Sequence, residues 1–106
     1  MFWGAVIHAN DPVLAFTVRK FDGLTDLQEA VGGFIEMVPS TGDRIKMYVC
    51  EDGLSEKMPP NPIASGLARQ HLVGDAVLFS GLDEDGDELS ITEHAAVQLL
   101  NEVSGV

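Results

Sequence analysis

The sequence has little of several things that would each mark a class of protein. Its 106 residues include one cysteine, one tyrosine, one tryptophan and six lysines and arginines. The single cysteine, Cys50, excludes an internal disulfide framework. No apolar run approaches the roughly 18 residues of a membrane-spanning helix, and the N-terminus has no basic lead like that of a signal peptide. We therefore expect a cytoplasmic protein without membrane association.

The scarcity of basic side chains leaves a large negative charge. Seventeen Asp and Glu give a net charge of −11, and residues 70–106 carry −8 of it because they hold eight acids and no Lys or Arg. Phosphate contacts need Lys and Arg, so direct binding to nucleic acid is disfavoured. Two interpretations of the acid remain: a coat that maintains solubility, or a face that binds a basic partner by imitating nucleic acid.

The length predicts one domain spanning residues 1–106, and the apolar patterning predicts an α+β fold. Alternation of apolar and polar residues predicts five strands. Their ranges are 2–9, 13–19, 34–38, 44–50 and 72–79. The last of these is almost continuously apolar, which is typical of a central strand. Short apolar stripes predict helices over 24–31, 62–69 and 91–103. We expect a mainly antiparallel sheet of about five strands with the helices covering one face.

The sharpest local signal is a helix that stops at two glycines and leads into a strand. Thr25 and Gln28 have the spacing of a capping box, which satisfies backbone N–H groups at a helix start. Gly32 and Gly33 can adopt the left-handed conformation that ends helices. We call this helix-to-strand junction the elbow.

The other two helices have start signals of their own. Residues 54–62 form a proline-rich loop expected to be stiff and irregular. Asn61 is expected to cap the helix that follows, with Pro62 at the favoured first helical position. Ser90 and Glu93 repeat the capping-box spacing before the last helix.

No sequence motif in this chain indicates a catalytic or cofactor-binding site. It has no nucleophile–base motif, glycine-rich phosphate loop or zinc-spaced Cys/His set. His8, at the end of a strand, has no partner close in sequence, and Cys50 stands beside two carboxylates rather than a histidine. We predict no catalytic residue and no cofactor. The alternative, a small-ligand protein or enzyme, would use the elbow glycines with Glu36, Tyr48 and Asn61.

The acidic run at residues 83–88 resembles a calcium loop only in part. Counted from Asp83, the acids at positions 1, 3 and 5 of an EF-hand loop are present, but position 6 is Glu88 and position 12 is His94. The run is therefore predicted to be a solvated turn and no metal site. On the alternative of nucleic-acid mimicry, its candidate partner-binding residues are Asp83, Asp85, Asp87 and Glu88.

Several strings together resemble a family of small domains of unknown function from bacteriophages, plasmids and bacteria. The most specific is Leu27-Gln28-x-x-Val31-Gly32-Gly33-Phe34-Ile35-Glu36, and the others are Cys50-Glu51-Asp52-Gly53, Pro60-x-x-Ile63-Ala64 and Val73-Gly74-Asp75-Ala76-Val77. The likeness spans about residues 14–102, with a longer loop at 58–62 as a departure. It implies a mobile-element origin and a host-cytoplasm setting, and no particular activity. We expect a non-enzymatic protein that binds a host protein.

Overall fold

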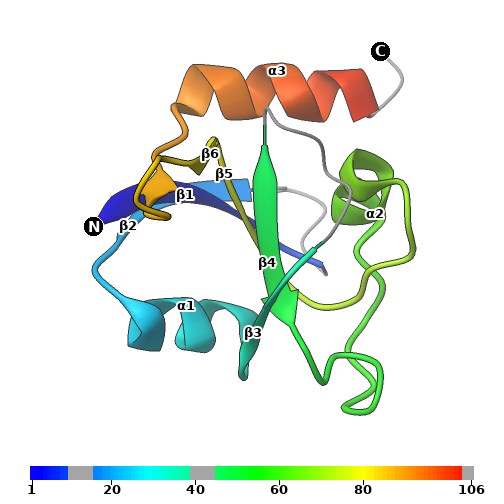
Figure 1. Cartoon of the computed structure of the whole chain (residues 1–106). Helices are drawn as coiled ribbons and strands as arrows, with labels where there is room; N and C mark the ends of the chain where they lie inside the picture. Colours follow the sequence, from blue (N-terminus) through cyan, green and yellow to red (C-terminus); the bar gives the residue numbers. More distant parts are fainter. Residues whose placement is uncertain (10–15, 39–44, 104–106) are drawn as a thin grey trace.

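Five strands form one antiparallel sheet in the spatial order β2-β1-β5-β4-β3 (Figure 1). The computed structural model describes residues 1–9, 16–38 and 45–103. The strands are β1 (Phe2–Ile7), β2 (Phe16–Phe21), β3 (Ile35–Met37), β4 (Lys46–Cys50) and β5 (Ala76–Phe79). The α+β prediction is confirmed, while the predicted turns at residues 10–12 and 39–43 lie outside the described residues.

The strand β5 occupies the centre of the sheet, as its continuous apolar sequence predicted. Successive side chains of a strand point to opposite faces. Ala76 and Leu78 lie in the apolar cluster on one face, whereas Val77 and Phe79 lie in the cluster on the other. All four residues are buried, so both faces of the sheet must be covered.

The three helices cover both faces, and the expectation that they cover one face is wrong. Their bounds are α1 (Leu24–Val31), α2 (Pro62–Ala68) and α3 (Glu93–Val103). α1 packs Leu27 and Val31 into one apolar cluster, whereas α2 and α3 pack into the cluster on the opposite face. Figure 1 shows α3 above the sheet and α1 below it. Among the described residues, no helix is long and apolar enough to cross a membrane.

Two helix starts also differ from prediction. α1 begins after Gly23 without a side-chain cap, so the expected capping box at Thr25 does not form. In α3, the Thr92 hydroxyl accepts the N–H of Ala95 at 3.1 Å. Ser90 lies before the helix, where its hydroxyl accepts the backbone N–H of Trp3 at 2.9 Å. A long-range contact with β1 thus uses the hydroxyl that the sequence assigned to the cap.

The proline-rich loop is more regular than expected. The Asn61 N–H donates to the Leu72 carbonyl at 3.0 Å, and the Gly74 N–H donates to the Pro59 carbonyl at 2.7 Å. Pro60 forms an isolated bridge with Val73 between these bonds. This pairing explains why β5 begins at Ala76 and not at residue 72: the preceding segment pairs with the loop instead of with the sheet.

Candidate functional site

The elbow ends α1 through two glycines that have different roles. The N–H groups of Gly32 and Gly33 both donate to the Gln28 carbonyl, at 2.9 and 3.0 Å. Gly32 has φ 84, the left-handed conformation predicted for a helix end. Gly33 is not left-handed, which corrects that part of the prediction. It is required by close packing, because a Cβ at Gly33 would lie 2.8 Å from the Cys50 Sγ.

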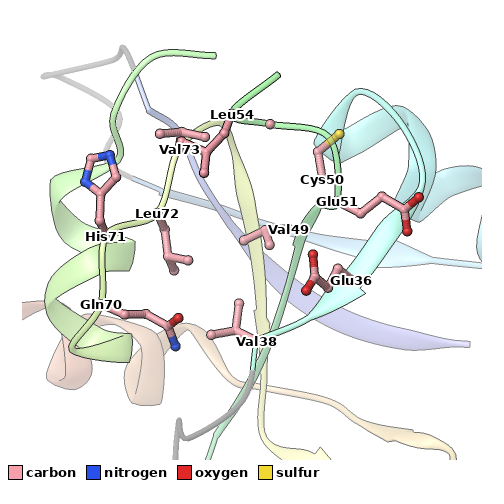
Figure 2. Close-up of a pocket in the computed structure, with 11 residues that line it drawn as sticks. Glu36, Val38, Val49, Cys50, Glu51, Leu54, Gln70, His71, Leu72 and Val73 are labelled. Carbon is pink, nitrogen blue, oxygen red and sulfur yellow. The ribbon is translucent and has the colours of Figure 1, made fainter. Parts of the chain in front are cut away.

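Two cavities share Cys50 as a lining residue, and the second of them lies at the elbow. The first has a volume of about 180 Å³ and lies between the β3–β4 pair and residues 70–73. Figure 2 shows Glu36, from β3, facing this cavity opposite Gln70 and His71. The second, of about 370 Å³, is lined by the end of α1 and the elbow, and by β4 with the turn after it. Its lining residues are Gln28, Gly32, Gly33, Phe34, Cys50, Asp52 and Glu56.

Each of these two cavities has one large exposed apolar side chain in its lining, Leu54 in the first and Phe34 in the second. Phe34 is 65% exposed and Leu54 is 73% exposed. The four carboxylates that line the two cavities are all exposed as well. They belong to Glu36, Glu51, Asp52 and Glu56. We call these six residues the elbow surface. Apolar anchors with a rim of one charge are suited to a partner of the opposite charge.

Asn61 is a structural residue at the start of α2, and its predicted cap is confirmed. Its side-chain oxygen accepts the N–H of Ala64 at 3.1 Å. The side chain is buried, and its amide nitrogen donates to the carbonyls of Ile7 and Gly74, both at 2.9 Å. Every polar atom of this amide therefore has a partner within the fold.

Tyr48 lies on the face of the sheet opposite to Glu36. It packs against the cluster between α1 and the sheet, and with Glu88 it lines a third cavity of about 280 Å³. Burial, followed by the negative charge of Glu88, raises the pKa of Tyr48 above its usual value of 10.0. The structure thus brings Tyr48 to Glu88, whereas the predicted grouping of Glu36, Tyr48 and Asn61 at the elbow glycines does not come together.

The acidic run forms the tip of a small hairpin, made by β6 (Gly81–Leu82) and β7 (Glu88–Leu89). The carboxylate oxygens of Asp83, Asp85 and Asp87 lie within 4.8 Å of one another, and all three side chains are exposed. One oxygen of Asp83 already accepts the N–H groups of Asp85 and Asp87, at 2.8 and 3.0 Å. This geometry gives Asp83 a role in shaping the turn, and the absence of a metal site stays a prediction.

His8 has two partners that the sequence did not reveal, because one lies on β2 and the other in the segment before β5. Its Nδ1 lies 3.4 Å from Asp75 Oδ2, and its Nε2 is hydrogen-bonded to Thr17 Oγ1 at 3.0 Å. Asp75 also accepts the N–H of Ala9 at 2.9 Å. The order hydroxyl, imidazole, carboxylate is also found in acyl-transfer enzymes, where it works with donors for an oxyanion. Here the contacts tie the end of β1 to β2 and to the segment before β5.

The fold and the site together define a class of protein: a small α+β domain with three layers and with an acidic, partly apolar surface around the end of α1. The chain belongs to the family described as Domain of unknown function (DUF3846), whose model matches residues 5–104. This confirms the resemblance to a family of domains of unknown function. No curated protein and no solved structure matches the chain.

Proposed function

We propose that this chain is a non-enzymatic, phage- or mobile-element-encoded domain that binds a basic host protein through the elbow surface. The observation that supports this is the exposure of Phe34 and Leu54 in two cavities that share Cys50 and whose four carboxylates are also exposed. Aromatic side chains dominate the energetics of protein interfaces. Exposed apolar side chains gathered at one place also mark interaction sites more often than isolated ones do.

The acids around the two apolar side chains set the chemistry of the partner. Carboxylates at the rim of an interface speed the encounter with a basic surface and disfavour acidic ones. The net charge of −11 acts in the same direction at longer range. The proposed partner therefore presents lysines or arginines around an apolar patch, and the complex should weaken as salt is raised.

The test uses paired surface variants on the intact chain. The double variant Phe34→Ser, Leu54→Ser removes both apolar anchors. The matched control is Val97→Ser, which alters an exposed apolar side chain of α3 outside the elbow surface. Wild type and both variants, each immobilised, are exposed to bacterial lysate, and the captured proteins are identified by mass spectrometry. The leading captured protein is then purified and titrated against each form.

The expected result is a basic protein that binds wild type and the Val97 variant equally. Its affinity for the double variant should fall by about tenfold or more, the range of an interface hot spot. Equal binding of all three forms would refute the elbow surface. Binding that is lost instead when Asp83, Asp85, Asp87 and Glu88 are neutralised would support nucleic-acid mimicry.

A further inference from the structure

The strand β3 lies at one edge of the sheet, and only alternate residues of it use their backbone groups to pair with β4. The Glu51 N–H donates to the Phe34 carbonyl, and the Val38 N–H donates to the Met47 carbonyl, both at 2.9 Å. Glu36 pairs with Val49 midway between these bonds. In an antiparallel pair, hydrogen-bonded and non-hydrogen-bonded positions alternate.

The alternation places the backbone groups of Ile35 and Met37 on the outer edge. Phe34, Glu36 and Val38 direct their N–H and C=O groups to β4, so the groups of the two residues between them point away from it. Among the described residues, no strand pairs with β3 on that side. An open row of N–H and C=O groups is a template for another strand. Ile35 and Met37 therefore offer two donors and two acceptors beside Glu36 of the elbow surface.

We infer that β3 accepts an extended segment of the basic partner as a sixth strand, an inference that rests on the proposed function and states how the partner docks. A partner residue opposite Glu36 would share its face of the sheet, and a residue two positions away would lie opposite Phe34. The segment is therefore expected to carry a Lys or Arg two residues from an apolar side chain. Its backbone bonds give affinity, and these two side chains give specificity.

Charge disfavours the alternative in which two copies of the chain pair through β3. A two-fold antiparallel pair made by the edge groups of Ile35 and Met37 would set Glu36 directly opposite its own copy. That position is the non-hydrogen-bonded one, where Cα atoms come within about 4.5 Å. Like charges directly opposite each other destabilise a sheet. A basic side chain at the same position is attracted instead.

The probe for the test is a capped heptapeptide with the order Thr-Phe-Thr-Lys-Thr-Val-Thr. In the proposed pairing, the amides of its two inner threonines point to β3 and the lysine amide points to solvent. A second peptide carries N-methyl groups on the two inner threonines, and a third carries one on the lysine. All three keep the same side chains and charge, so they differ only in which donors face the edge.

Binding is followed by NMR of the isotopically labelled chain. The first and third peptides should shift the amide signals of Ile35 and Met37 and slow the exchange of these amides by about tenfold or more at saturation. The second should bind at least about tenfold more weakly. In the chain, Met37→Pro removes one edge donor without touching the bonds to β4, and should weaken binding of the first peptide. Met37→Ala is its control for the lost side chain.

Each outcome decides between the two proposals. Equal binding of all three peptides, with shifts at Phe34 and Leu54 alone, overturns strand addition but leaves the elbow surface as the binding site. If no signal shifts at either place at millimolar peptide, strand addition is overturned, while the elbow surface is decided by the lysate capture and titration described above. Shifts at Ile35 and Met37 that grow with protein concentration without any peptide assign the edge to self-association, and also overturn the inference.

Discussion

Replacing Asn61 should reveal how much of the fold depends on one buried side chain. The residue is 1% exposed, and its amide joins three parts of the chain: α2 through Ala64, β1 through Ile7, and the segment before β5 through Gly74. Asn61→Ala removes the helix cap, which costs about 1 kcal/mol. It also leaves two buried carbonyls without this donor, at about 1 kcal/mol each.

The expected loss is therefore about 3 kcal/mol, a large part of the 5–15 kcal/mol that stabilises a typical domain. In a chain of about this size it corresponds to a fall in melting temperature of roughly 10–20 °C. Chemical denaturation followed by circular dichroism measures the free energy of unfolding directly. Ser65→Ala is a matched control, because it removes two hydrogen bonds with Leu72 at a partly buried position. It should cost only about 1 kcal/mol.

Asn61→Asp tests the helix cap separately from the two hydrogen bonds by which the amide bridges Ile7 and Gly74. The new side chain still accepts the N–H of Ala64, but at pH 7 it directs negative oxygens at the two carbonyls that the amide served. It should be at least as destabilising as Asn61→Ala. The folded state disfavours this carboxylate, so the pKa of the new carboxyl is raised on folding. Stability relative to wild type should then recover as the pH falls through that raised pKa. A variant as stable as wild type at pH 7 would refute the bridging role.

Two further predictions concern the elbow and the aromatic cavity. Gly33→Ala should destabilise the fold by about 1–3 kcal/mol because its Cβ meets the Cys50 sulfur. The same change in a Cys50→Ala background should cost much less. The cost of Gly32→Ala, which comes from its φ of +84°, should be the same with or without Cys50→Ala. A double-mutant cycle measured by denaturation would contradict this if the cost of Gly33→Ala persisted in the Cys50→Ala background. The raised pKa of Tyr48 means that the unfolded chain loses the phenolic proton first, so stability should decline as the pH rises above the usual value of 10.0. Glu88→Gln should lower that pKa and lessen the decline; absorbance titration of the single tyrosine would show an unchanged midpoint if the charge of Glu88 had no influence.

The features that the sequence by itself determined are those controlled by neighbouring residues. The end of α1 at Gly32 and the start of α2 at Asn61 and Pro62 follow from local backbone conformation and capping. The continuous apolar run of β5 determined its central place, because both of its faces must be buried. The same run also indicated that helices must cover both faces of the sheet, because a strand buried on both sides needs cover on both sides. The prediction that the helices cover one face did not use this information.

Only the tertiary structure decided which distant groups meet. The cap of α3 moved to Thr92 because Ser90 bonds Trp3, a residue 87 positions away. The partners of His8 likewise come from β2 and from the segment before β5, and no local pattern identifies them. Glu36 and Tyr48 lie on β3 and β4, the two paired strands that follow the elbow. The alternation of side chains along a strand nevertheless places them on opposite faces of the sheet. The open edge of β3 depends on the order of all five strands. Such positions are set by the packing of the whole sheet, which residue spacing does not encode.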